Sequence, residues 1–181
     1  MLEMAIVIIV VLLVLLPLYI TTVYNKLTKQ KLRVKQAESA IDVYLQQRFD
    51  LIPNLVETVK AYAAHEKSIF EEVAKLRSAY MESKSLSTAT ELDKAVNNLI
   101  AVAENYPELK ASENFLNLQK NLTKMEDQLQ AARRLYNTDV TTYNTSLETF
   151  PSNIIANFFG FKQEELFQLE PGKEQNIKVE L

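Results

Sequence analysis

The 181-residue chain has no cysteine and no tryptophan, one histidine and only two glycines. The lack of cysteine excludes disulfides, thiolate zinc sites, iron–sulfur clusters and cysteine nucleophiles. A single histidine excludes most metal sites built on two histidines, and so few glycines leave little material for β-turns or phosphate-binding loops. What the chain does contain is 48% apolar residues, in a length typical of one domain. We therefore expect a structural or binding protein that catalyses no reaction and holds no cofactor.

Charge is unevenly distributed along the chain. Up to Gln36 there are five basic residues against one acid, Glu3, and the remainder holds fifteen basic and twenty-two acidic residues. The five basic residues are Lys26, Lys29, Lys31, Arg33 and Lys35. An acidic body argues against a nucleic-acid partner, because phosphates are bound by cations. The basic cluster directly follows the most apolar stretch, which indicates contact with membrane lipid.

The apolar stretch Met4–Val23 holds twenty residues without a charge. As a helix it spans about 30 Å, the thickness of a hydrocarbon core. We predict a retained transmembrane anchor over residues 1–25; a cleaved signal peptide needs a cationic start and a small-residue cleavage site, and neither is present. Lysine and arginine stay on the cytoplasmic side, so the N-terminus should face out and the body should face the cytosol. The expected location is the bacterial cytoplasmic membrane.

Beyond the anchor, apolar residues recur every three or four positions, which predicts an all-α, antiparallel helical bundle. The anchor is expected to continue as a stalk helix through Phe49. Asp50 is placed to cap a second helix that follows Pro53 and runs from Asn54 to Tyr80. A third helix is expected from about Thr88 to Asn105.

The fourth helix, Ser112–Thr149, has the clearest pattern, since its apolar residues step by three and four as in a coiled coil. This seam consists of Leu118, Leu122, Met125, Leu129, Tyr136, Val140, Tyr143 and Leu147. At about 57 Å the fourth helix is roughly twice as long as the third. Part of the seam must therefore stay exposed, pair with the stalk or pair with another copy. We expect it to drive assembly of a homo-oligomer, because exposed apolar stripes of this size usually mark interfaces.

The alternating direction of the helices brings residues 150–161, at the end of the predicted bundle (26–161), back toward the membrane. We predict that Ile154, Ile155, Phe158, Phe159 and Phe161 enter the headgroup region; the alternative is that they cap the core of the bundle. Residues 162–181 are expected to form an extended tail or a small hairpin.

Residues that could carry chemistry are few. His65 has no second histidine and no Glu-x-x-His spacing, so a structural or surface role is expected and no metal site is predicted. Four charged residues border the apolar stripes: Arg48, Asp50, Arg77 and Arg133. Partial burial would require opposite charges beside them, so we expect pairs that set the helix register. Tyr136-Asn137 and Tyr143-Asn144 repeat one heptad apart, which places both tyrosines on one face.

Four stretches of the chain resemble the LemA family. They are SAIDVYLQQRFDLIPNLVETVKAYAAHE (39–66), LKASENF (109–115), ARRLYN (132–137) and FPSNIIA (150–156). The likeness extends over nearly the whole chain. It implies a bacterial single-pass membrane protein with a cytoplasmic bundle of mostly antiparallel helices, and it brings no catalytic residues, because the family has no established enzymatic activity.

Together these features predict a membrane-anchored cytoplasmic scaffold that self-assembles and organises protein partners or the membrane. The alternative is a monomeric, membrane-tethered adaptor that binds a client protein in a groove of the bundle.

Overall fold

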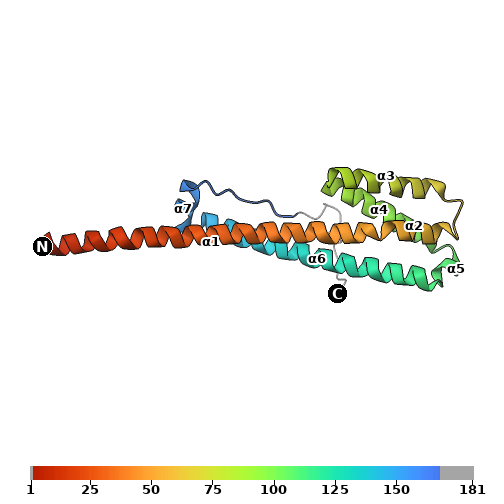
Figure 1. Cartoon of the computed structure of the whole chain (residues 1–181), viewed down its shortest axis with the longest axis horizontal. Coiled ribbons are helices and arrows are strands. Elements are labelled where there is room, and N and C mark those ends of the chain that lie inside the picture. Colours follow the sequence, from red (N-terminus) through yellow and green to blue (C-terminus); the bar gives the residue numbers. More distant parts are fainter. Residues whose placement is uncertain (1, 168–181) are drawn as a thin grey trace, which may run out of the picture. The chain divides into compact units, whose positions relative to one another are not determined.

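A computed structural model describes residues 2–167, without the side chains of residues 5, 7, 8, 10 and 12. The described residues form seven α-helices and no strand (Figure 1). The helices are α1 (Leu2–Asp50), α2 (Ile52–Lys60), α3 (Lys67–Ser83), α4 (Leu86–Ala103), α5 (Pro107–Lys110), α6 (Glu113–Glu148) and α7 (Ser152–Phe158). The all-α prediction is confirmed, and the predicted first, third and fourth helices correspond to α1, α4 and α6.

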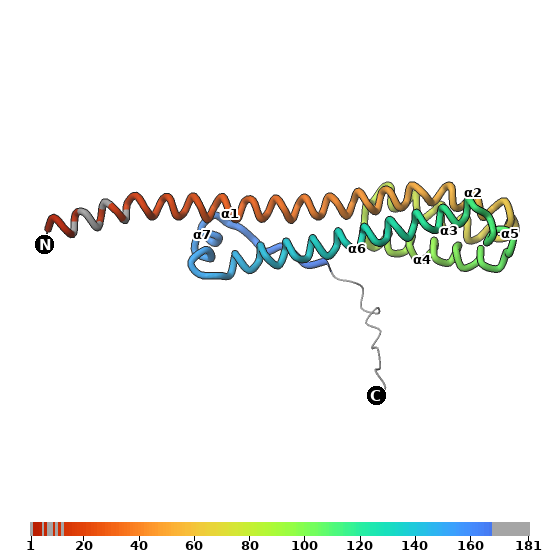
Figure 2. Tube along the Cα trace, turned by 90° about the horizontal axis from the view of Figure 1, so that it is seen from below, coloured from red at the N-terminus to blue at the C-terminus, as the bar shows by residue number. Residues whose placement is uncertain are grey.

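The chain divides into two compact units. The terminal unit comprises Met1–Ser39 and Ala132–Leu181, and the central unit comprises Ala40–Ala131. Helices α1 and α6 each contribute to both units. Within the terminal unit, α1 and α6 run side by side in opposite directions, and α7 lies against them (Figures 1 and 2).

The core of the terminal unit joins α1, α6 and α7. Its buried members are Val23, Leu27 and Val34 of α1, Val140, Tyr143 and Leu147 of α6, and Ile155 and Ala156 of α7. The α1 and α6 members are spaced three, four or seven apart, which keeps them on one helix face. The seam of α6 therefore pairs with the stalk here, one of the three arrangements that the sequence left open.

In the central unit, α3 packs closely against α4. Helix α4 buries the small side chains of Ala89, Ala95 and Ala103. Phe49 and Tyr80 join α1 to α3 by an edge-to-face ring contact, with the ring centroids 4.6 Å apart. Both side chains are buried.

The predicted second helix is wrong as a single element, because the chain turns between α2 and α3. The backbone amides of Tyr62 and Ala63 donate to the carbonyl of Val59, and Ala63 is buried at the turn. The apolar stripe pauses at His65-Glu66-Lys67, so a continuous helix would present no apolar face there. The pause was visible in the sequence, but three polar residues are too few to locate a break.

The predicted cap by Asp50 is also wrong. Leu51 occupies the capping position of α2 and has no side-chain bond to it, whereas Asp50 is the last residue of α1. The carboxylate of Asp50 instead accepts a hydrogen bond from Gln46 (2.9 Å) and pairs with Arg77 at 3.8 Å. An N-cap side chain must sit just outside the helix that it caps, and Asp50 lies one residue too early.

Candidate functional site

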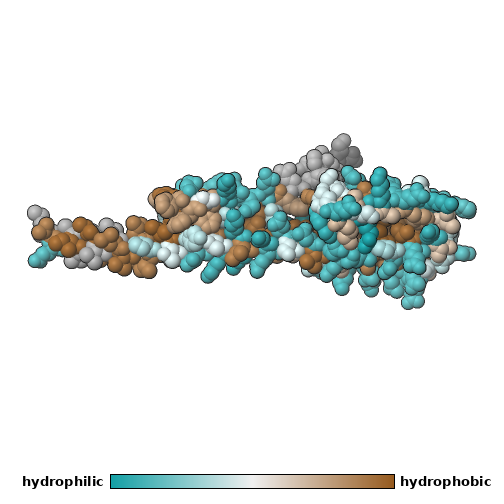
Figure 3. All heavy atoms as spheres, turned by 45° about the horizontal axis from the view of Figure 1, so that its top comes forward, coloured by the Kyte–Doolittle hydropathy of each residue, from teal (hydrophilic) through white to brown (hydrophobic). Residues whose placement is uncertain are grey.

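The N-terminal part of α1 carries exposed apolar side chains, drawn brown in Figure 3. They include Leu2, Met4, Ile6, Ile9, Val11, Leu13, Val14, Leu15, Leu16 and Leu18. Among the described residues, no helix is long and apolar enough to count as a membrane span. Five residues of the stretch 4–23 are those whose side chains are not described. The transmembrane anchor therefore stays a prediction from the sequence.

A row of exposed cations follows this stretch on α1. Its members are the predicted membrane-interface residues Lys26, Lys29, Lys31, Arg33 and Lys35. The ammonium of Lys31 lies 3.8 Å from a carboxylate oxygen of Glu164. This is a partly exposed pair, whose contribution to stability is small.

Helix α7 has two faces. Ile155 and Ala156 are buried in the core of the terminal unit, and Phe161 packs against that core. Ile154 and Phe158, one turn apart, are 60% and 82% exposed. One face of α7 therefore caps the core, as the alternative interpretation expected, and contact of the other face with the headgroup region stays a prediction.

The side chains of the predicted assembly seam lie largely inside the chain. Leu122, Leu129, Val140, Tyr143 and Leu147 are buried, and Leu118, Met125 and Tyr136 are half-buried. A surface already covered within one chain is a poor starting point for assembly. Assembly through the seam stays a prediction.

Two asparagines of α6 bind the non-helical segment that follows α7. Asn137 donates to the carbonyl of Phe167 (3.0 Å) and accepts from its amide (2.8 Å). Asn144 does the same with Glu164, at 2.8 and 3.1 Å. Seven helical residues rise about 10.5 Å, and three extended residues span about 10 Å, so the two repeats match. The heptad repeat of the asparagines was visible in the sequence, but their partner was not.

This segment covers residues 162–167 and contains neither helix nor strand. Its ordering on α6 is completed by Tyr136, whose hydroxyl donates to the carbonyl of Glu165 (2.9 Å), and by Arg133, which lies over the ring of Phe167. The rest of the predicted tail, residues 168–181, lies outside the described residues.

Tyr136 and Tyr143 occupy equivalent heptad positions but differ in hydrogen bonding. The hydroxyl of Tyr143 is fully buried and has no hydrogen-bond partner among the described residues. Burial raises the pKa of Tyr143 above its ordinary value, and the carboxylate of Glu164 adds to the shift. Burial, followed by Glu38, Glu164 and Glu165, likewise raises the pKa of Tyr136.

We expect Tyr143→Phe to stabilise the protein by about 1 kcal/mol at neutral pH, because it removes a buried hydroxyl without a partner. The unfolded state releases the phenol proton near pH 10, whereas the folded state holds it to higher pH. The contribution of the neutral Tyr143 phenol to stability is therefore fully present below pH 10 and is lost as the pH rises further. Tyr143→Phe should make this alkaline loss shallower in denaturant titrations. The control, Tyr136→Phe, loses a hydrogen bond and should destabilise; equal effects of the two would contradict this account.

A partly buried ion-pair cluster centres on Arg48 in the central unit. The guanidinium of Arg48 pairs with Glu126 of α6 through a hydrogen bond and with Asp93 of α4, with an Nε–Oδ1 distance of 3.5 Å. Arg77 donates from its Nε to the carbonyl of Phe49 (3.3 Å). These contacts join different helices, as expected for charges that set the packing register.

Replacing Arg48 with methionine should cost about 2–3 kcal/mol, because two carboxylates lose their common counter-charge. The cost lies below that of a fully buried pair, since the side chains of Glu126 and Asp93 are 28% and 21% exposed. Denaturation followed by circular dichroism measures it. The exposed Lys124→Met on α6 is the control, with an expected change within about 0.5 kcal/mol. A loss as small as that of the control would contradict the role assigned to the cluster.

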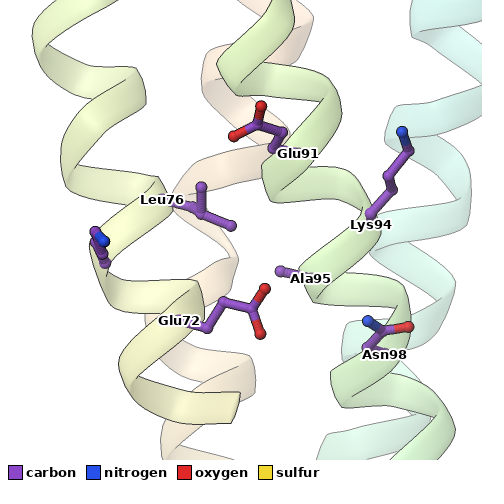
Figure 4. Close-up of a pocket in the computed structure, with 7 residues that line it drawn as sticks. Glu72, Leu76, Glu91, Lys94, Ala95 and Asn98 are labelled. Carbon is purple, nitrogen blue, oxygen red and sulfur yellow. The ribbon is translucent and has the colours of Figure 1, made fainter. Parts of the chain in front are cut away.

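Two shallow grooves mark the surface of the central unit. A groove of about 420 Å³ between α4 and α6 has Arg48 and Glu126 in its lining, together with Val96, Ile100 and Leu122. Another, of about 380 Å³, lies between α3 and α4. Figure 4 shows Leu76 and Ala95 between these helices, with the carboxylates of Glu72 and Glu91 beside them and Lys94 pointing away.

His65 is exposed in the turn between α2 and α3. Across the part of the chain that the structure describes, no group of three or more histidine, aspartate or glutamate side chains could hold a metal ion. The arrangement is suited to packing and binding, through an apolar surface on the terminal unit and grooves on the central unit.

The comparisons with known proteins agree with the resemblance noted in the sequence. The LemA family pattern matches residues 37–181. Magnetosome protein MamQ 2 of Paramagnetospirillum magneticum is 27% identical over 184 residues, covering 85% of this chain and 68% of that protein. Magnetosome protein MamQ of Magnetospirillum gryphiswaldense is 24% identical, covering 88% and 71%. Protein LemA of Metamycoplasma hominis is 23% identical over 149 residues, covering 80% and 68%. The family match spans well over half of the chain, so this protein belongs to the LemA family.

Proposed function

We propose that this protein is anchored in the bacterial cytoplasmic membrane by residues 4–23 and holds a helical body on the cytoplasmic side, where it organises protein partners. One observation carries the proposal: a charge-free stretch with exposed apolar side chains on α1 is followed at once by five exposed cations. Leaving a leucine exposed instead of burying it costs about 1.5–3 kcal/mol, so the stretch requires an apolar environment. A hydrocarbon core of about 30 Å has the length to supply it.

The cations favour one orientation. Lysine and arginine near a span remain on the cytoplasmic side, which places the N-terminus outside and everything after Tyr24 in the cytosol. There the row from Lys26 to Lys35 attracts anionic headgroups, at about 1 kcal/mol for each charge.

Extraction and proteolysis test the anchor. The full chain should remain in the membrane pellet after carbonate washing. Protease added to inverted vesicles, whose cytoplasmic face is outward, should digest the body. Release into the wash would overturn the anchor, and digestion only in right-side-out cells stripped of their outer layers would overturn the orientation.

Two forms of partner organisation differ in oligomeric state. The scaffold that the seam predicts is a homo-oligomer, whereas the adaptor is a monomer with a client protein in a bundle groove. Burial of the seam within the chain favours the adaptor, since little of this surface is left for a second copy. Light scattering of the purified protein in detergent separates the two. A protein mass near 20.7 kDa supports the adaptor, and a multiple of it supports the scaffold.

A further inference from the structure

Residues 150–161 form a charge-free segment in a chain of which 24% of residues are charged. Glu148 and Lys162 lie just outside it. The segment contains four phenylalanines and two isoleucines, and its polar members are limited to serine and asparagine. Outside the N-terminal stretch, this composition is typical of an interfacial membrane segment rather than of a loop in water.

The segment exposes four large apolar side chains, and two of them, Ile154 and Phe158, lie one turn apart on α7. Phe150, Ile154 and Phe158 are 75%, 60% and 82% exposed, and they are spaced four residues apart. Phe159 lies beside Phe158, with its ring centroid 5.1 Å from that of Phe158. Ile155 and Ala156 of α7 are buried in the core, so packing sets the orientation of Ile154 and Phe158.

A contact with α1 sets the level of Phe159 along the anchor helix. The ring of Tyr24 contacts the rings of Phe159 and Phe161 edge to face. The ring centroids are 4.9 Å apart for Phe159 and 5.6 Å apart for Phe161. Tyr24 directly follows the apolar stretch 4–23, and Lys26 begins the row of cations. Phe159, and Phe158 beside it, therefore lie where the apolar part of α1 ends and its charged part begins.

We propose that Phe150, Ile154, Phe158 and Phe159 form a second membrane contact, which enters the headgroup region of the cytoplasmic leaflet beside the anchor. This inference rests on the proposed anchor. Phenylalanine suits this position, because the apolar face of an interfacial helix enters the boundary between headgroups and acyl chains. Phe161 is not part of this contact, because it packs on the core.

The consequence is a two-point attachment. A single span leaves a helix free to rotate about its axis, whereas a second contact on one side of α1 fixes which side of the terminal unit faces the bilayer. The cations from Lys26 onward then lie just above the headgroups.

Single tryptophans test the proposal, because the chain has none of its own. Three full-length variants are compared in phosphatidylcholine–phosphatidylglycerol vesicles with or without bromine on the acyl chains near the headgroups. Phe158→Trp reports the proposed contact, Leu16→Trp reports the anchor, and Leu135→Trp reports an exposed site on α6. All three positions are exposed, so the substitutions should leave folding intact, which circular dichroism verifies.

We expect brominated lipid to remove most of the Phe158→Trp fluorescence and its emission to be blue-shifted, while Leu135→Trp is unchanged. Failure to quench Phe158→Trp overturns the second contact, whatever Leu16→Trp does, and shows that this surface faces water or a protein. Failure to quench Leu16→Trp overturns the anchor instead. The two failures are therefore distinguishable.

Discussion

Two aspartates in the apolar stretch of α1, Leu13→Asp with Leu16→Asp, should release the protein from membranes. Both positions lie near the middle of residues 4–23, and a charged residue there costs about 2.5–3.5 kcal/mol on insertion scales. Together the cost is roughly 5–7 kcal/mol, enough to abolish stable insertion. Both leucines are exposed, so the helical body should fold as before. Carbonate washing followed by immunoblotting measures the released fraction.

The matched control places the same two charges outside the stretch. Leu32 and Val43 are also exposed apolar residues of α1, and Leu32→Asp with Val43→Asp should leave the chain in the pellet. Retention of the Leu13→Asp, Leu16→Asp variant in the washed pellet would show that something other than this stretch holds the protein. Equal release of both pairs would show a general effect of added charge.

Phe49→Ala should destabilise the protein by about 4 kcal/mol. The Phe49 ring is completely buried at the end of α1 and meets the ring of Tyr80 edge to face. Removing the ring loses the free energy gained by burying its apolar surface, leaves a cavity and removes the aromatic contact with Tyr80. The central unit holds the grooves, so they should be lost over the same range of denaturant. Denaturation in detergent, followed by circular dichroism, measures the loss.

Phe158→Ala makes the same chemical change at an exposed site. The side chain of Phe158 is 82% exposed, and its removal should change stability by no more than about 0.5 kcal/mol. Similar losses for Phe49→Ala and Phe158→Ala would contradict the burial that the structure assigns to them.

The sequence predicted the long helices well because their signals are local. Apolar residues every three or four positions mark α1, α4 and α6, and Pro151 lies just beyond the end of α6. The sequence did not predict the turn between α2 and α3, because residues 61–66 contain no glycine or proline. It also failed for Asp50, since the end of α1 could not be located to one residue.

The candidate site was predicted less completely. The cations after Val23 and the phenylalanines of residues 150–161 were identified from composition alone. The sequence could not predict that Ile155 faces the core while Phe158 does not. A seven-residue helix has too few turns for its apolar face to be assigned from the pattern. Asn137 and Asn144 were noticed only as a repeat, since their partners are backbone groups of a distant segment.

The sequence by itself determined that the chain is helical, where its charge-free stretch lies and that cysteine chemistry and sites built on two histidines are excluded. These properties depend on residue type and on spacings within a few turns. The tertiary structure alone decided that the seam of α6 pairs with the stalk, that Tyr143 buries its hydroxyl, and that Tyr24 contacts Phe159 and Phe161 at the end of the apolar stretch. Each of these depends on which side chains meet across more than a hundred residues of chain, and a periodic pattern gives the face of a helix but not its partner.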